Sequence, residues 1–341
     1  MRTLILGLVC LAVSLSSAQD FATAVKAGLD KADDDSAFAI RGSDPAWRFL
    51  VNELKHLQHG DIGAADLKTI NAEGSDPVPA ISQYNDELKA LGVELLLVPV
   101  PPKAAIYPEK LSGHPGVAPS LAAFYKKLAA AGVQVLDLQA EFLKSKAAAP
   151  DKQLYCATDS HWSPYGAQLA AGLVGAKFKG RKELIEDQMR DLVKLKEEPL
   201  NIHGDLLTEA EKAAAPQEKL PMVRTGLAAN PDGTDVTTVD SAEHSPLLVM
   251  GDSHCQVFRR GGSMHTTCAG FIDHLITDLS LPVEEVSTQA SGGEGPRIEI
   301  ARKTVKQPDF WAKKKIVVWL FSAREFTQGR WKVIPAKVEK K

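Results

Sequence analysis

The hydrophobic positions along the chain form two kinds of pattern, which alternate. Short runs of consecutive apolar residues are typical of buried parallel strands, because a strand covered on both faces carries few polar side chains. Such runs occupy residues 93–100, 133–138, 247–250 and 316–321. Apolar residues at helical spacing occupy residues 46–59, 82–91, 119–131 and 165–178. This order predicts an α/β fold of three layers with a central, mostly parallel sheet.

Single residues support several of these boundaries. Gly92 and Gly132 each follow a predicted helix, where glycine is favoured because it adopts the left-handed conformation without strain. Ser163 is a suitable N-cap for the helix at 165–178, and Pro164 suits its first position.

Residues 179–245 interrupt the alternation. We interpret them as an insertion or cap over the sheet, within one domain that spans residues 46–335. Inside this segment the pattern predicts a charged helix at 182–196, a short polar helix at 209–215, and a hairpin of residues 222–224 with 235–239 about a Pro-Asp-Gly turn. Its charged runs are expected to be solvated faces.

The first 18 residues have the layout of a secretory signal peptide. Arg2 precedes an apolar run at 3–15, and Ser16-Ser17-Ala18 supplies small residues for cleavage. The run is shorter than the roughly 20 residues that a membrane-spanning helix needs. We therefore expect export across the inner membrane and a periplasmic location.

Two further segments flank the predicted domain. Residues 19–45 form an amphipathic or partly disordered lead-in, with a helical pattern at 21–31. Residues 336–341 form a short basic tail.

The composition is that of an ordinary globular protein, with 44% hydrophobic and 24% charged residues. A formal net charge of -3 provides no general basic field, which argues against nucleic acid as the main partner.

The cysteines and histidines give little sign of a metal centre. Removal of the signal peptide leaves three cysteines, none of them at Cys-x-x-Cys spacing; they are Cys156, Cys255 and Cys268. Either a disulfide between the first two or a set of buried thiols is compatible with this spacing. The spacings of His254, His265 and His274 match no common zinc pattern, so we expect neither a metal ion nor a cofactor.

Two motifs carry the candidate chemistry: Thr158–Pro164 and, downstream, Val249–Ser253. A serine hydroxyl becomes a nucleophile only beside a base, and a histidine base needs a carboxylate to fix its tautomer. Ser253, His161 and Asp159 are the candidates for these three roles. Taken alone, Gly-Asp-Ser is equally compatible with a strand-to-helix turn, and Asp-x-His with a turn residue and an exposed ring.

Other residues are candidates for supporting roles. Ser253 follows a predicted strand, so its own N–H is the expected first oxyanion donor, and Gly293 of the Ser-Gly-Gly turn is a candidate second donor. Arg297 and Arg324 are candidates for substrate contact, or else for structural ion pairs. His254 is a candidate for lining the pocket, and Trp162 is expected to pack beneath the Asp-x-His loop.

The combination of Asp-x-His-Trp at 159–162 with Gly-Asp-Ser at 251–253 resembles the alginate O-acetyltransferase AlgX/AlgJ family, whose catalytic domains are SGNH hydrolase-like. Further stretches resemble the same family; they are Trp47–His59, Val98–Lys103 with Tyr107-Pro108, and Val317–Trp319 with Arg324. The acid and base precede the serine, which is a circularly permuted order relative to ordinary SGNH esterases.

The resemblance implies an enzyme that transfers acetyl groups to hydroxyls of an exported polysaccharide through an acetyl-serine, with Ser253, His161 and Asp159 as its triad. It also implies a membrane-bound O-acyltransferase that delivers the acetyl group. Two alternatives stay open: a carbohydrate esterase that uses the same triad with water as acceptor, and a non-catalytic polysaccharide-binding protein.

Overall fold

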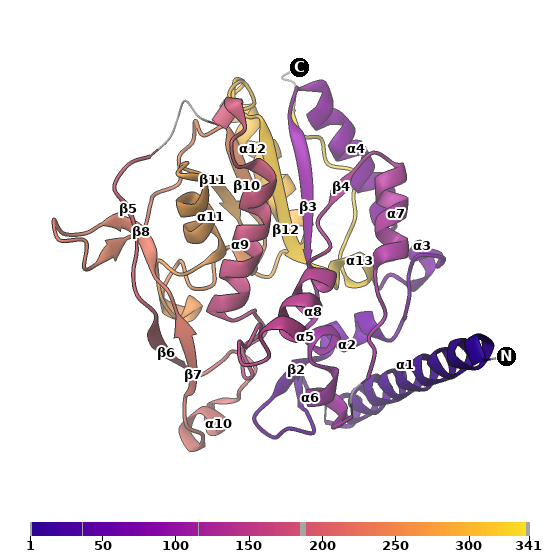
Figure 1. Cartoon of the computed structure of the whole chain (residues 1–341). Helices are drawn as coiled ribbons and strands as arrows, with labels where there is room; N and C mark the ends of the chain where they lie inside the picture. The colour runs from indigo at the N-terminus through magenta and orange to yellow at the C-terminus, as the bar shows by residue number, and fades with distance from the viewer. Residues whose placement is uncertain (1, 36, 115, 185–188, 339–341) are drawn as a thin grey trace.

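The centre of the protein is a five-stranded sheet in which every neighbouring pair is parallel (Figure 1). The computed structural model describes residues 2–35, 37–114, 116–184 and 189–338. The strand order is β11–β10–β12–β3–β4. The strands are β3 (Glu94–Val100), β4 (Gln134–Val135), β10 (Leu247–Gly251), β11 (Glu284–Ser287) and β12 (Ile316–Ser322).

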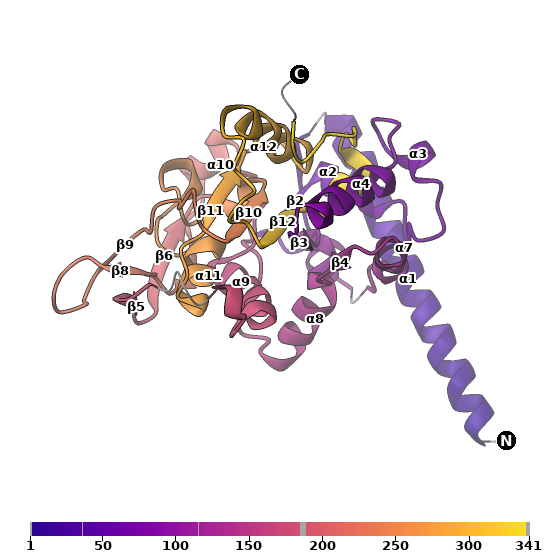
Figure 2. The same ribbon diagram turned by 90° about the horizontal axis from the view of Figure 1, so that it is seen from above.

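Helices cover both faces of this sheet (Figure 2). One layer contains α8 (Leu138–Ala148), α9 (Pro164–Phe178) and α11 (Phe271–Leu279). The other contains α4 (Pro77–Ala90), α7 (Ala122–Ala130) and α12 (Glu294–Lys306). Alternate residues of each strand feed the two cores: Val318 and Leu320 of β12 join the first, whereas Val317 and Trp319 join the second. The predicted three-layer α/β fold is confirmed.

Short elements complete the layers. The helices are α2 (Val51–Leu57), α3 (Leu67–Ile70), α5 (Lys103–Ile106), α6 (Pro108–Ser112), α10 (Glu209–Ala214) and α13 (Glu325–Gln328), with 3₁₀ turns η1 (Lys182–Leu184), η2 (Ser253–Cys255) and η3 (Gly262–Met264). At the N-terminus, α1 (Arg2–Asp35) includes the helix expected at 21–31. Within the described residues, no helix combines the length and apolar character that crossing a membrane requires.

Several local predictions are confirmed. The Ser163 hydroxyl accepts a hydrogen bond from the Gly166 N–H at 3.0 Å, so Ser163 is the N-cap of α9 with Pro164 in the first turn. Gly92 and Gly132 have φ angles of 73° and 77°, as expected after a helix.

The segment at 46–59 differs from its prediction, since its helix begins only at Val51. Its first residues form β2 (Arg48–Leu50), which pairs with β1 (Ala39–Arg41). The lead-in is therefore partly ordered against the domain.

Residues 179–245 form two small antiparallel sheets. One contains β5 (Leu192–Lys194), β8 (Thr225–Ala228) and β9 (Val236–Thr237), and the other contains β6 (Glu198–Ile202) and β7 (Glu218–Met222). The helix predicted at 182–196 is wrong over 189–196, where β5 pairs with β8; residues 185–188 lie outside the described part.

The hairpin about the Pro-Asp-Gly turn exists, but its first strand is β8 rather than residues 222–224. Met222 belongs instead to β7, opposite Glu198. The short polar helix is confirmed as α10, which Thr208 and Glu211 start with a reciprocal capping box.

Candidate active site

Ser253 and His161 meet at the carboxyl end of the sheet. β10 ends at Gly251, and Ser253 begins η2 two residues later. The His161 Nε2 atom lies 2.8 Å from the Ser253 Oγ atom, although 92 residues separate them along the chain. Gly251 makes the turn possible, because a Cβ atom there would lie 2.0 Å from the carbonyl oxygen of Leu320 on β12.

Asp159 closes its loop onto the same histidine. Its Oδ1 atom lies 2.7 Å from His161 Nδ1 and also accepts the backbone N–H of His161 at 3.0 Å. One carboxylate oxygen therefore fixes both the ring and the backbone of His161. The result is a continuous line of hydrogen bonds from Asp159 through His161 to Ser253, the geometry required of an acid, a base and a nucleophile.

The second oxygen of Asp159 has partners that the sequence did not reveal. Its Oδ2 atom lies 2.8 Å from His265 Nε2 and accepts the backbone N–H of Asp205 at 3.0 Å. His265 is 106 residues from Asp159 and belongs to the C-terminal end of η3. No local motif marks it, so only the fold brings the two residues together.

Burial and charge act in opposite directions on this pair. Burial alone would raise the pKa of Asp159, but the charge of His161 and hydrogen bonds from His161 and His265 hold that pKa well below its usual value. Burial alone would lower the pKa of His161, but the Asp159 carboxylate outweighs it and raises that pKa above 6.5. The pair thus stabilises an imidazolium, the form that a general base takes after it accepts a proton.

A buried lysine, Lys103, forms hydrogen bonds with the backbone of the Asp-x-His loop. The Lys103 Nζ atom donates to the backbone carbonyls of Arg48, Ala157 and Asp159, at 2.9, 3.3 and 2.6 Å. Only 1% of Lys103 is exposed. Burial lowers its pKa, which the neighbouring Glu53 opposes. Lys103 therefore ties the end of β3 to the loop that carries the candidate acid and base.

The segment at 179–245 also forms hydrogen bonds with the Asp-x-His loop. Glu218 accepts the backbone N–H groups of Ala157 and Thr158 at 2.7 and 3.0 Å. Asp205 accepts the hydroxyl of Ser160 at 2.6 Å, and a Cβ atom at Gly204 would lie 2.1 Å from the Thr158 carbonyl oxygen. Glu218 and Asp205 therefore bind the Asp-x-His loop directly. The charged runs of this segment were expected to be solvated faces, and these two residues differ from that expectation.

The turn that carries Ser253 is fixed by a second Asp–His pair. Asp252 Oδ1 accepts the backbone N–H of His254 at 2.9 Å and lies 3.0 Å from its Nδ1 atom, while Oδ2 accepts the Ser322 N–H at 2.8 Å. Burial would raise the pKa of Asp252, but the charge of His254 and its hydrogen bonds lower it to about 2. His254 is only 2% exposed and lies behind the site, so the expectation that it lines the pocket is not met.

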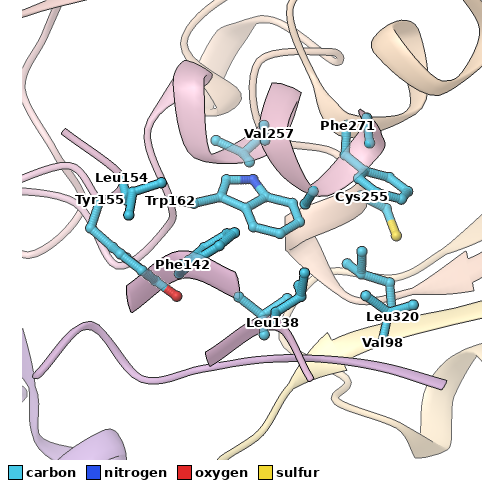
Figure 3. Close-up of a cluster of buried hydrophobic side chains, with 14 of the residues drawn as sticks. Val98, Leu138, Phe142, Leu154, Tyr155, Trp162, Cys255, Val257, Phe271 and Leu320 are labelled. Atoms are coloured by element: carbon cyan, nitrogen blue, oxygen red, sulfur yellow. The ribbon is translucent and has the colours of Figure 1, made fainter. Parts of the chain in front are cut away.

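Trp162 packs beneath the Asp-x-His loop, as predicted. It is fully buried among side chains from several elements, including Phe142 of α8 and Phe271 of α11 (Figure 3). Its ring stacks on Phe271 with centroids 5.9 Å apart and meets the edge of His254 at 5.2 Å. The indole thereby joins the loop to the turn that carries Ser253.

A cavity of about 520 Å³ opens beside Ser253 and His161. Its other lining residues come from the ends of β2, β11 and β12 and from neighbouring loops; they include Phe38, Leu50, Asn52, Asp205, Met264, Gln289, Ser291, Gly292, Arg324, Glu325 and Arg330. Ligands of open α/β sheets bind at this carboxyl edge. The size is within the usual range for small-ligand sites, roughly 300–1,000 Å³.

Of the two candidate arginines, the structure places one in the cavity. Arg324 lines it and lies 3.8 Å from Glu53. Arg297 is fully buried between the rings of Trp319 and Trp331, so it is placed as a structural residue and cannot reach a ligand in the cavity.

Gly293, the candidate second oxyanion donor, does not itself line the cavity. It is the residue before α12, its carbonyl accepts the Arg297 Nε–H at 3.1 Å, and its neighbour Gly292 lines the cavity instead.

The three mature cysteines are free and buried, so the disulfide between Cys156 and Cys255 is not formed. The thiol of Cys156 donates to the carbonyl of Trp162 at 3.4 Å, and that of Cys255 lies against Gly251. Both residues belong to the same hydrophobic core, where they pack as small apolar side chains.

Asp159, His161 and Asp205 have ligand atoms within 4.8 Å of one another, a spacing that a metal ion could bridge. The ring nitrogens of His161 are directed at Asp159 and Ser253, and Asp205 accepts from Ser160. A cation here would have to displace those hydrogen bonds, so the donor set fits a proton relay better than a metal centre.

Comparison with known proteins gives a separate line of evidence on the family and the fold. Residues 63–323 match a family described as an SGNH hydrolase-like domain of the acetyltransferase AlgX. A probable alginate O-acetylase AlgJ of Pseudomonas syringae pv. tomato is 31% identical over 172 residues, which is 50% of this chain and 40% of that protein. The chain thus matches less than half the length of that relative.

Two solved structures share the fold. The O-acetyltransferase domain of Pseudomonas putida AlgJ superposes with a TM-score of 0.58 at 22% identity, covering 85% of this chain and 92% of that domain. Pseudomonas aeruginosa AlgX superposes with a TM-score of 0.53 at 17% identity, covering 84% of this chain and 62% of that protein.

Proposed function

The chain belongs to the AlgX family of SGNH hydrolase-like acetyltransferase domains, and from this premise we propose that it is a serine O-acetyltransferase acting on an exported polysaccharide. One observation carries the proposal: the line of hydrogen bonds Asp159–His161–Ser253, which ends at a cavity. The names of the relatives, alginate O-acetylase and AlgX, support acetyl transfer to a sugar hydroxyl.

In the first half-reaction, Ser253 Oγ attacks the carbonyl carbon of an acetyl ester while His161 Nε2 takes the hydroxyl proton. The carbonyl oxygen gains negative charge, and we assign its stabilisation to the backbone N–H of Ser253. As the intermediate collapses, the ester C–O bond breaks and His161 returns the proton to the departing alcohol. The product is acetyl-Ser253.

In the second half-reaction, His161 takes the proton of a sugar hydroxyl, and the sugar oxygen attacks the acetyl-serine. The bond from the acetyl group to Ser253 Oγ breaks, and His161 returns the proton to that oxygen. The acetylated sugar leaves and the enzyme is restored. Water in place of the sugar would complete the reaction of an esterase, so the acceptor alone distinguishes the two activities.

Two features of the proposal concern the cell rather than the site. The signal-peptide pattern at residues 1–18 supports export, and we place the mature protein in the periplasm. An acetyl donor has to reach that compartment, and a membrane-bound O-acyltransferase is the expected supplier.

The test is an incubation of the mature protein with an acetyl ester donor and oligosaccharides, followed by mass spectrometry. Acetylated sugar should form, and Ser253→Ala should abolish it. Ser263→Ala is the matched control, because Ser263 is exposed on η3 and outside the cavity. Free acetate that is unaffected by any oligosaccharide would identify an esterase instead.

A further inference from the structure

Phe38 is an exposed aromatic side chain at the edge of the catalytic cavity. The side chain is 64% exposed. Five large hydrophobic side chains are exposed in the described ranges, and of these Phe38 alone is aromatic. It lines the same cavity as Ser253 and His161. A single exposed apolar side chain is ordinary on a protein surface, so it is the place of this ring, at the cavity that holds Ser253 and His161, that makes it a candidate ligand contact.

The position of Phe38 is fixed by the fold. Its carbonyl accepts the backbone N–H of Val51, the first residue of α2, at 3.1 Å. The next residue, Ala39, pairs with Leu50 in the β1–β2 ladder. Since Leu50 and Asn52 also line the catalytic cavity, these backbone contacts hold the main chain of Phe38 at its rim.

A second cavity, of about 470 Å³, is also lined by Phe38. It shares Phe38 and Asp205 with the catalytic cavity, so the two hollows adjoin along these residues. Its polar lining includes Lys31, Arg41 and Thr208. The Thr208 hydroxyl already donates to Glu211 in the capping box of α10. Lys31 and the remaining N–H groups of Arg41 can donate hydrogen bonds to hydroxyl oxygens.

The pairing of an aromatic platform with flanking hydrogen-bonding groups matches the chemistry of a pyranose ring. Such a ring has an apolar face of C–H groups, which packs against an aromatic side chain, and a rim of hydroxyls, which binds polar groups. Two hollows that meet at one ring suit successive units of a chain better than a single small molecule.

We propose that Phe38 is the platform of a second sugar-binding site, which holds one unit of the acceptor polysaccharide while another unit lies beside Ser253. The assignment rests on the proposed function for the identity of the acceptor, but it concerns binding and not acetyl transfer. The enzyme would then bind a chain of sugars more tightly than a single sugar.

The experiment measures binding by calorimetry in a Ser253→Ala background, with hexamers of β-1,4-linked mannuronate, glucose and N-acetylglucosamine tested in parallel. At least one hexamer should bind. Phe38→Ala should weaken that binding about tenfold, a loss of about 1.4 kcal/mol, and Phe38→Tyr should retain it. Val333→Ala is the matched control, because Val333 is 66% exposed and outside both cavities.

Equal affinity in Phe38→Ala and its parent would overturn the site, as would failure of all three hexamers to bind. A loss in Phe38→Tyr as large as that in Phe38→Ala would also count against a stacking platform. Acetylation of Ser253 by an ester donor, followed separately in the unsubstituted protein, tests the proposed function. The two inferences can therefore fail independently.

Discussion

The Oδ2 atom of Asp159 lies 2.8 Å from His265 Nε2, and its Oδ1 atom lies 2.7 Å from His161 Nδ1, so one carboxylate joins two imidazole rings. A carboxylate held at both oxygens cannot rotate away from the base. In the described part of the chain, His265 forms no hydrogen bond with Ser253 or with His161, and we infer that it acts as a positioning residue.

Replacement of His265 by alanine should lower the rate of Ser253 acetylation roughly 10- to 100-fold, because the carboxylate loses one of its anchors. The carboxylate would also share its charge with one ring instead of two, which favours the imidazolium of His161. The midpoint of the pH–rate profile should therefore move to higher pH. His265→Gln, which keeps a donor, should recover part of the rate; an unmoved midpoint would leave His265 a purely structural role.

The pH dependence of the parent enzyme should report His161. A general base works in its neutral form, and the Asp159 carboxylate raises the pKa of His161 above 6.5 against the effect of burial. Acetylation of Ser253 should therefore increase with pH through a midpoint above 6.5. The Asp159→Asn variant lacks the charge that raises the pKa of His161 but keeps the burial that lowers it, so the midpoint should fall. The maximal rate should drop by about 10⁴-fold. Stopped-flow measurement with a chromogenic ester checks both.

Ser253 and His161 should behave as a unit. Either Ser253→Ala or His161→Ala should lower the rate on the order of 10⁴- to 10⁶-fold, and the double substitution should cost little more than one alone. A sulfonyl fluoride should label Ser253 in the parent and not in His161→Ala. Additive losses in the double variant, or full activity of folded Ser253→Ala, would remove Ser253 from the mechanism.

Lys103 should matter for stability as well as for the loop. Lys103→Met removes a buried cation that donates to three backbone carbonyls, of which Ala157 would keep the Arg48 N–H as a donor. It also takes one of two nearby cations from the buried Glu53 and leaves Arg324 as the other. The free energy of unfolding should fall by roughly 3–5 kcal/mol. Lys126→Met, on the exposed face of α7, should change it by less than about 0.5 kcal/mol. Urea denaturation compares the two, and equal effects would contradict the structural role of Lys103.

The sequence predicts four of the five strands of the sheet, and it points to the three residues of the candidate relay, because their signals are local. The fifth strand, β11 (Glu284–Ser287), has no continuous apolar run and is not predicted. Continuous apolar runs mark β3, β10 and β12, which are buried on both faces. Asp159 and His161 are two residues apart and close onto each other within one turn of chain. Ser253 follows its strand directly, so the α/β pattern itself places it at the carboxyl edge.

The remaining features depend on contacts between distant segments, which periodicity does not encode. His265 and Asp205 reach Asp159 from 106 and 46 residues away. The charged stretch at 189–196 has helical composition, but pairing with β8 makes part of it a strand. Arg297 looks like a ligand-binding residue in the sequence, and only the position of two tryptophans, Trp319 and Trp331, shows it to be enclosed.

Two contacts limit how this protein can diverge: Gly204 lies against the backbone of Thr158, and the Asp205 N–H donates to the Asp159 carboxylate. A lid that only covered a cavity could be shortened, lengthened or exchanged between relatives, and only the choice of substrate would change. Here an insertion of one residue before Gly204 would present a different N–H to the carboxylate and a side chain to the Thr158 carbonyl. Variation in this segment should therefore concentrate in its outer turns, such as that between β8 and β9, and a graft from a relative would have to include residues 204–218 as one block.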